Sequence, residues 1–165
     1  MKSPNLALIL GVTALSLAAQ HAAHASCSDG TIQGDYAFTV HGQALSADGS
    51  TSVALIDGVG TITFDGAGNL EQQDYIIKNG TQSPGGLGPP NPSGFHTGET
   101  GTYTVNADCT GSANIVLSPG NERSLAFVIS RSGRSIHAVV TSAVVNGSPA
   151  VLQVYSDFEK INARD

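Results

Sequence analysis

Residues 26–165 of this 165-residue chain are predicted to form an all-β domain, a single antiparallel meander of about eight strands closed into a small barrel. Two segments read almost as copies of one β-hairpin, GTITFDGAGNL at Gly60–Leu70 and GTYTVNADCTGSANI at Gly101–Ile115. Turn signals recur between short alternating runs along the whole domain. No stretch has the apolar stripe of a helix, and the 20 glycines of the chain would weaken one.

Eight runs alternate between apolar and polar residues, as half-buried strands do. In the first run Tyr36, Phe38 and Val40 share one face, and the residues between them share the other. The predicted strands are Thr31–Leu45, Val53–Phe64, Leu70–Lys78, Thr97–Val105, Ser112–Leu117, Ser124–Ser130, Ser135–Ser142 and Ala150–Phe158.

Short turns join these strands. Asp65–Asn69 connects the second strand to the third, Pro119–Asn121 leads into the sixth and Ser132–Gly133 into the seventh. Asn146–Gly147 is a strong two-residue hairpin signal, and Pro149 stands at the start of the last strand, where a missing N–H is tolerated. Connections this short pair each strand with its predecessor, and closure into a barrel removes the exposed edges.

One segment is irregular: Ser83–Gly94 reads SPGGLGPPNPSG, with four prolines and four glycines. Such a composition excludes a regular element. Two interpretations stay open, a mobile loop at the barrel rim and a lid or recognition loop over the mouth of a pocket.

The N-terminus has the pattern of a signal peptide, predicted to span residues 1–25. Lys2 precedes an apolar stretch from Leu6 to Ala19, which is shorter than the roughly 20 residues that span a bilayer. An Ala-His-Ala triplet then suits cleavage after Ala25. Cys27 would lie close to the new N-terminus, but the leucine expected before a lipidated cysteine is missing, which disfavours acylation.

Cys27 and Cys109 are the two cysteines of the chain, and in an exported protein they are expected to form one disulfide. Cys27 precedes the first strand, and Cys109 lies in the turn of the second hairpin copy. No spacing supports a reactive or metal-binding thiol pair.

Composition limits the partners of the protein. After cleavage about 140 residues remain, enough for one domain with a single core. Without Lys2, six Lys and Arg face 13 Asp and Glu, a net charge of about −7 that opposes binding to nucleic acid and anionic membranes. No second apolar stretch approaches membrane length. We therefore expect an exported protein, periplasmic or extracellular, without a membrane span and without a cofactor.

The titratable residues give few signals of chemistry. A metal site shared by His41, His96 and His137 is conceivable, but each histidine alone is more often a surface or core residue, so no metal is expected. A carboxylate inside the barrel would have a raised pKa and could act as an acid or base, whereas on the outer face it would be solvated, which is the favoured interpretation. The carboxylates in or near strands are Asp35, Asp57, Asp74, Glu99 and Asp157. The absence of a G-x-S-x-G motif disfavours hydrolase chemistry.

Large aromatic residues recur on the predicted strands. Packed inward they form an ordinary core, which is favoured because protein interiors are normally filled; with a gap between them they would line an apolar cavity. The set comprises Tyr36, Phe38, Phe64, Tyr75, Tyr103, Phe127, Tyr155 and Phe158. If a ligand binds, its candidate contacts are Tyr36, Phe38, Tyr75, Tyr103 and Phe127.

The order of four segments, GTIQGDYAFTVHG, GVGTITFDGAGNL, TGETGTYTVNADCTG and LAFVIS, resembles a group of exported bacterial proteins of unknown role. These are similar to β-barrels of the allene oxide cyclase and dirigent type, and the expected architecture is calycin-like or allene oxide cyclase-like. The resemblance covers Gly30 to about Thr141 and carries no catalytic residue over to this chain. It implies a barrel that could hold a small apolar molecule.

Three functions follow from these expectations. The first is non-catalytic binding of a small apolar ligand, or of another surface, by a secreted barrel. The second is a cyclase-like enzyme that folds an apolar substrate inside the barrel with the help of a buried polar group. The third is a structural or adhesive role in the cell envelope. A hollow interior with inward polar side chains would favour the first two, and a packed interior would exclude them.

Overall fold

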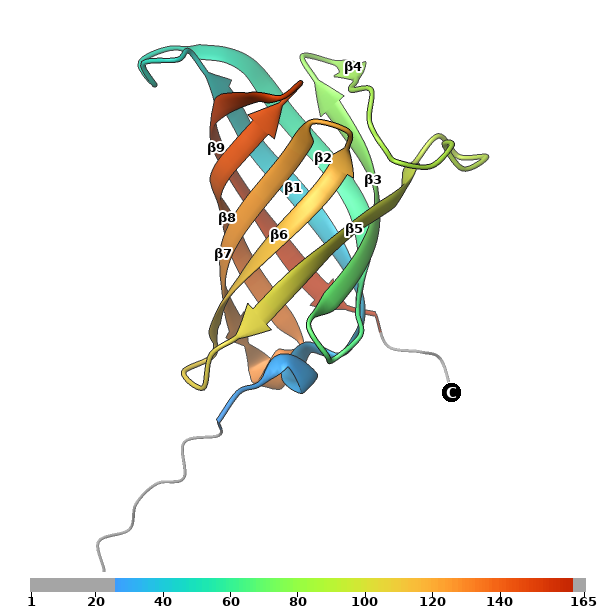
Figure 1. Ribbon diagram of the computed structural model, residues 1–165, viewed down its shortest axis with the longest axis vertical. Coiled ribbons are helices and arrows are strands. Elements are labelled where there is room, and N and C mark those ends of the chain that lie inside the picture. The colour runs from blue at the N-terminus through green and yellow to red at the C-terminus, as the bar shows by residue number, and fades with distance from the viewer. Residues whose placement is uncertain (1–25, 162–165) are drawn as a thin grey trace, which may run out of the picture.

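The computed structural model describes residues 26–161, so the predicted signal peptide lies outside the described residues (Figure 1). Nine strands and two short 3-10 helices make up this part of the chain. In order they are η1 (Asp29–Ile32), β1 (Gly34–Leu45), β2 (Ser52–Phe64), β3 (Asn69–Lys78), β4 (Thr81–Gln82), β5 (His96–Val105), β6 (Thr110–Ser118), β7 (Asn121–Ser130), η2 (Arg131–Gly133), β8 (Ser135–Val145) and β9 (Ser148–Lys160).

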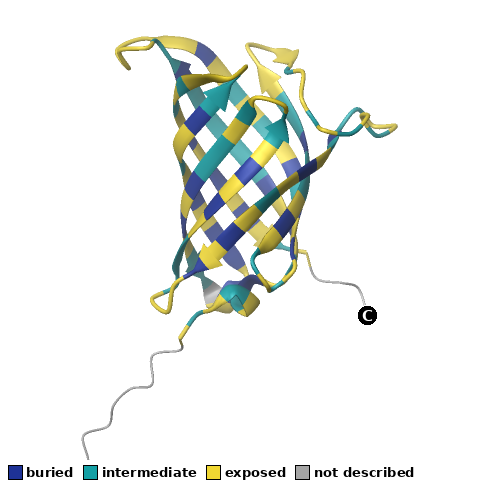
Figure 2. Cartoon of the chain, in the orientation of Figure 1, coloured by how far each residue is buried: buried dark blue, intermediate teal, exposed yellow. Residues whose placement is uncertain are grey.

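Eight of the strands form a closed antiparallel barrel, as predicted. Each strand pairs with its neighbours in the chain, and β1 closes the ring by pairing with β9 from Tyr36–Lys160 to Leu45–Val151. The two-residue β4 is not one of the eight barrel strands; it pairs with the last residues of β3, Ile77 and Lys78. Buried and exposed positions alternate along the strands, with one set facing the barrel interior (Figure 2).

The predicted turns form where the sequence places them. Asn146 and Gly147 both have positive φ, 51° and 75°, as a two-residue hairpin turn of type I′ requires. In the β2–β3 turn the Asp65 carboxylate accepts hydrogen bonds from the backbone N–H groups of Ala67 and Asn69. Local turn chemistry therefore fixes the register of these hairpins.

The first strand begins later than predicted. Thr31 and Ile32 belong to η1, and β1 begins at Gly34, whose φ is 123°. The alternating pattern of β1 does not extend to these residues because Ile32, in η1, packs into the core cluster. Ile32 is fully buried and closes the end of the barrel next to η1, which is the lower end in Figure 1.

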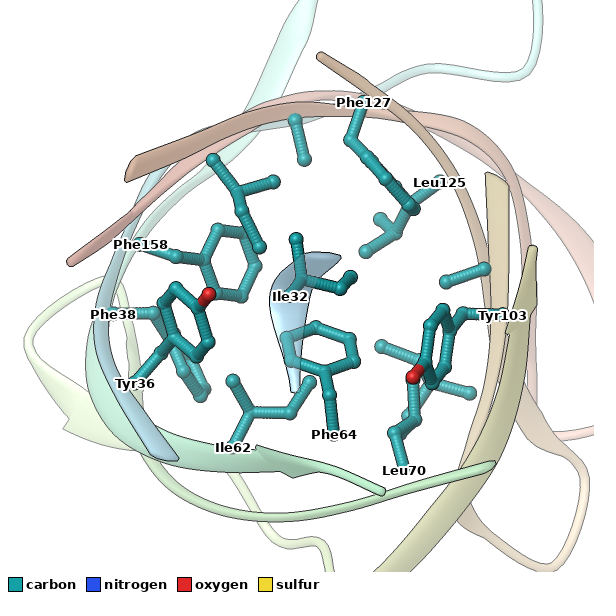
Figure 3. Close-up of a cluster of buried hydrophobic side chains, with 14 of the residues drawn as sticks. Ile32, Tyr36, Phe38, Ile62, Phe64, Leu70, Tyr103, Leu125, Phe127 and Phe158 are labelled. Atoms are coloured by element: carbon teal, nitrogen blue, oxygen red, sulfur yellow. The ribbon is translucent and has the colours of Figure 1, made fainter. Parts of the chain in front are cut away.

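A packed core fills the half of the barrel next to η1. Ile32 projects into its centre, surrounded by aromatic and aliphatic side chains from all sides of the ring (Figure 3). Phe64 contacts both Tyr36 and Tyr103 edge-on, with ring centroids 5.5 and 4.9 Å apart. The hydroxyl of the buried Tyr36 donates to the carbonyl of Gly133 in η2, so both short helices are tied to this end. These side chains form one continuous packed cluster in this half of the barrel.

Hydrogen bonds and one disulfide hold the N-terminal segment against the lower end. Cys27 and Cys109 are bonded with their Cα atoms 5.0 Å apart, which confirms the predicted pairing and leaves Cys27 no free thiol for acylation. Nearby, the Asp29 carboxylate accepts a hydrogen bond from the backbone N–H of Val105 at 2.7 Å. The segment that carries Ile32 is therefore fixed to the turn between β5 and β6.

No helix within residues 26–161 is both long and apolar enough to cross a bilayer.

The disulfide predicts a redox-dependent stability. Cys27→Ser opens a loop with a sequence separation of 82 residues, which the chain-entropy description values at roughly 4 to 5 kcal/mol. We expect the melting temperature under oxidising conditions to fall by on the order of 10 °C. Thermal unfolding followed by circular dichroism tests this. In excess reductant wild type and variant should melt together, and an equal difference in both conditions would contradict the disulfide account.

Candidate functional site

The half of the barrel away from η1 is hollow. A cavity of about 970 Å³ occupies it and opens at the rim formed by the β1–β2, β6–β7 and β8–β9 turns. Its floor consists of side chains that also belong to the packed core, namely Phe38, Ile115, Leu125 and Phe158. A filled interior was expected from the sequence, but the barrel has one filled half and one hollow half.

The cavity arises from a gradient of side-chain size along the strands. On β1 the inward positions run from Tyr36 and Phe38 at the packed end to Ala44 at the open end. On β9 the inward positions after Phe158 are Ser156, Val154, Leu152 and Ala150, none of which is aromatic. Smaller side chains at the open end leave empty the space that aromatic rings fill at the packed end.

One wall of this cavity carries a buried polar cluster. Asp74 on β3 and His96 and Glu99 on β5 are buried, with exposures of 4, 6 and 1%. His96 Nδ1 lies 3.0 Å from Asp74 Oδ1, and the two groups share a hydrogen bond. Gln72 Nε2 donates to Glu99 Oε2 at 2.7 Å. We call Asp74, His96 and Glu99 the polar cluster.

A β-bulge brings the two β5 members of the cluster to the same face. Gln72 pairs with Glu99 and Asp74 with His96, so β5 has one residue more than β3 between these pairs. In a regular strand, residues three apart point to opposite faces. The extra residue corrects this, and Gly98 accommodates it with a φ of +76°.

The loop before β5 covers the cluster at the rim. Pro84, Gly85 and Gly86 line the cavity, and a Cβ added to Gly85 would lie 2.9 Å from His96 Nδ1. Gly88 forms a bridge with Thr97, its N–H donating to the Thr97 carbonyl at 2.8 Å. The first half of the Pro/Gly-rich segment is thus packed against the site, which favours the second of the two open interpretations, a loop over the mouth of a pocket.

The electrostatics of the cluster follow from burial. Removal from water raises the pKa of Glu99 to about 8, the Asp74 carboxylate adds to the rise, and the Gln72 hydrogen bond opposes it. At neutral pH Glu99 is therefore largely protonated. Burial also raises the pKa of Asp74, although the hydrogen bond and charge of His96 and the charge of Arg123 counteract it.

Arg123 on β7 is a cationic residue whose charge interacts with Asp74 of the cluster. Burial lowers the pKa of Arg123 itself. It lines the cavity, and its Nη1 donates to the backbone carbonyls of Glu122 and Val144 at 2.7 and 2.9 Å. The guanidinium is thereby held on the barrel wall. Its charge moderates that of the cluster from a fixed position.

This arrangement has two chemical capacities. A carboxyl group that stays protonated at neutral pH can donate a proton or a hydrogen bond to a bound molecule. Alternatively, the ligand atoms of Asp74, His96 and Glu99 all lie within 4.8 Å of one another, which is close enough to hold a metal ion.

The three histidines of the sequence analysis do not converge. His96 is inside the barrel, whereas His41 and His137 lie on its outer face, each hydrogen-bonded across the sheet to an aspartate. These three histidines therefore cannot share one metal ion. Alternation along β1 and β8 places these two side chains outward.

The carboxylates divide between the two faces. Asp35, Asp57 and Asp157 are exposed, as favoured. Asp74 and Glu99 are buried, so the interpretation that they are solvated is wrong for both. Asp74 follows the alternation of β3 and shares the inward face with Ile76. For Glu99 a glycine within the predicted strand was the available signal, since such a glycine often marks a bulge.

Of the five aromatic candidates for ligand contact, one lines the cavity. Phe38 forms part of the floor, while Tyr36, Tyr103 and Phe127 lie in the packed core. Tyr75 points away from the cavity and contacts Phe95 edge-on at 5.7 Å. Most of the cavity wall consists of aliphatic side chains that the sequence analysis did not single out.

Comparison with known protein families and with curated proteins finds no match for this chain.

The bulge predicts that Gly98 tolerates substitution poorly. A Cβ at Gly98 would lie 2.8 Å from the backbone N of Gly88, in addition to the strain of a positive φ. Gly49 has a similar φ of +73° with nothing within 4 Å, so it is a matched control. We expect Gly98→Ala to lower stability by about 1 kcal/mol or more beyond Gly49→Ala, which carries the φ strain alone. Equal losses in urea unfolding would contradict the close packing of loop and bulge.

The burial of Glu99 predicts a pH-dependent stability. Its pKa is higher in the folded protein than in the unfolded chain, so folding favours the protonated form. This stability is complete below the unfolded value of 4.5 and is lost as the pH rises through about 8. Glu99→Gln cannot ionise. We therefore expect the melting temperature of the variant, relative to that of wild type, to rise by roughly 3 °C or more between pH 5 and pH 9.

The measurement is made with a chelator present, so that only protons compete for the site. Glu71 on β3 is exposed and provides the control. The pH profile of Glu71→Gln should run parallel to that of wild type. A parallel profile for Glu99→Gln as well would contradict the burial of an ionisable carboxyl group.

Proposed function

We propose that this protein is an exported binding protein that holds a small, largely apolar molecule in the open half of its barrel. The observation that carries this proposal is the cavity of about 970 Å³ above a packed floor. Volumes of this size are typical of ligand sites, and such sites combine apolar walls with a few polar groups that fix orientation. Here Phe38, Val40 and Leu125 are among the apolar wall residues, and the polar cluster supplies the polar groups.

The architecture supports a preformed site. The disulfide, the Ile32 plug and the aromatic core keep one end of the barrel closed, and the cavity at the other end is present without a ligand. A site that exists before binding requires little ordering of the protein, which favours affinity. The Pro84–Gly86 segment, packed beside His96, gives the mouth a covered side.

A second candidate function is cyclase-like catalysis on an apolar substrate. It is favoured by one observation, the buried carboxyl group of Glu99, with its raised pKa, beside the Asp74–His96 pair. Such a group can donate a proton to a substrate oxygen, and the walls can hold a chain in a folded shape. The envelope role that a filled barrel would suggest has less support, because the interior is hollow.

Binding is tested with a dansyl-labelled fatty acid, whose fluorescence rises in an apolar site. Ser156 faces the cavity, and Ser142 lies exposed on β8. We expect Ser156→Trp to weaken binding at least about tenfold, which corresponds to ~1.4 kcal/mol, because the indole occupies the cavity. Ser142→Trp makes the same change outside and should bind like wild type. No binding by wild type, or equal loss in both variants, would overturn the proposal.

Two further measurements complete this test. Circular dichroism verifies that Ser156→Trp is folded, and Ser156→Leu replaces it if it is not. The molecule extracted after prolonged incubation is analysed by liquid chromatography and NMR, because a cyclised isomer has the same mass as its substrate, and the result distinguishes the two candidate functions. A carrier returns the molecule chemically unchanged, whereas an enzyme returns a rearranged product, with an unsaturated fatty-acid epoxide as the substrate offered.

A further inference from the structure

We propose that Asp74, His96 and Glu99 together bind one divalent first-row transition-metal ion, such as Zn²⁺ or Mn²⁺, on the wall of the cavity. This goes beyond the binding of an apolar molecule and does not depend on it. The ion would be held by residues of β3 and β5, with its remaining coordination positions directed away from the strands.

The geometry of the cluster suits such an ion. The three ligand atoms lie within 4.8 Å of one another, and His96 Nδ1 is 3.0 Å from Asp74 Oδ1. Two neighbouring ligands on an ion with bonds of about 2.1 Å are themselves about 3 Å apart, so this pair already has the required separation. The longer side chain of Glu99 has to close the remaining gap. Rotation about its side-chain torsions would bring the Glu99 carboxylate closer to the ion.

The donor set indicates the class of metal. One imidazole and two carboxylates offer a nitrogen and several oxygens, without sulfur. Imidazole suits zinc, iron, copper and nickel, whereas carboxylates alone suit magnesium, calcium and manganese. The combination therefore favours a transition ion over Mg²⁺ or Ca²⁺. Three protein ligands with open positions are the pattern of catalytic metal sites rather than of structural ones.

The charge of the site favours a cation. Two carboxyl groups are buried next to each other in an apolar barrel, which is costly for both in their charged form. The charged and titratable groups that face them are His96 on β5, Arg123 on β7 and Lys78 near the open end of β3. Arg123 hydrogen-bonds through Nη1 to backbone carbonyls. A divalent ion between the two carboxylates would balance their charge directly.

Gln72 gives the cluster an outer partner. Its amide Nε2 donates to Glu99 Oε2 at 2.7 Å and so orients the carboxylate that has to close on the ion. Hydrogen bonds of this kind commonly orient metal-binding side chains. Gly98 contributes as well, since the bulge at this residue places His96 and Glu99 on one face.

The barrel offers an internal comparison. His41–Asp57 and His137–Asp157 are also cross-strand pairs with short hydrogen bonds, of 3.0 and 2.7 Å, but both are exposed. Within residues 26–161, the polar cluster is the one group in which three potential ligands come this close. Specific metal binding should therefore follow the buried cluster and not the two surface pairs.

The test uses the purified, disulfide-bonded protein after treatment with EDTA and dialysis. Isothermal titration with ZnCl₂ and with MnCl₂ should give a stoichiometry of one ion per chain for at least one of them, with MgCl₂ at least tenfold weaker. Titration with CoCl₂ should produce the visible absorption of a bound cobalt ion. The absence of stoichiometric binding for all of these ions would overturn the proposal.

Variants assign the site. Glu99→Gln keeps an oxygen that can accept the Gln72 hydrogen bond but loses the carboxylate, and Asp74→Asn removes the second one. Each should weaken metal binding at least tenfold. The double variant His41→Gln, His137→Gln removes the surface histidines and should bind like wild type. Unchanged binding in folded Glu99→Gln, or loss confined to the surface variant, would refute the assignment.

The proposed metal site and the proposed binding of an apolar molecule can be tested independently of each other. The dansyl fatty-acid titration is performed in EDTA, where a barrel that binds the probe does so without metal. Loss of probe binding therefore contradicts the proposed function alone. Loss of metal binding contradicts the metal site alone.

Discussion

Closure of the sheet by the pairing of β1 with β9 is the constraint on which the rest of the structure depends. Once the ring is complete, every strand has one face toward a lumen of fixed width, and each inward side chain either fills that lumen or leaves it empty. Aromatic side chains fill the half next to η1, and small side chains such as Ala44 and Ser156 leave the other half open. The cavity is thus a consequence of residue size along continuous strands.

Stability and chemistry are placed at opposite ends of this barrel. Ile32, the Tyr36–Gly133 hydrogen bond and the disulfide are at the packed end. Buried carboxyl groups, which oppose folding when charged, are confined to the hollow part of one wall. A closed, well-packed end can offset the cost of the polar cluster, and such separation is common where a site carries unfavourable burial.

Much of the fold could be predicted from the sequence because local rules decide it. Alternation along β1 predicts Tyr36 and Phe38 on one face, and Asn146–Gly147 predicts its hairpin. The disulfide followed from the number of cysteines. The start of β1 could not be predicted, because the burial of Ile32 depends on the distant strands that it plugs.

The candidate site was harder to predict for a related reason. Strict alternation separates His96 and Glu99 onto opposite faces, and a single additional residue at the bulge reverses this. The sequence signal for that reversal is one glycine in a chain of 20 glycines, most of which serve other purposes. The cavity could not be predicted from the sequence either, since an inward alanine is compatible with a filled core when its neighbours are large.

The bulge and the Pro/Gly-rich segment are best understood as one unit. A Cβ at Gly98 would lie 2.8 Å from the backbone N of Gly88, and a Cβ at Gly88 would lie 2.7 Å from Thr97 Oγ1. The Gly88 N–H also bonds to Thr97 within the bulge. Gly85 likewise allows the chain to approach His96 Nδ1. Contact with β5 therefore explains the glycines at positions 85, 86 and 88 of the loop. Because the same contacts cover the polar cluster, the residues that shape the strand also limit the access of water to its chemistry.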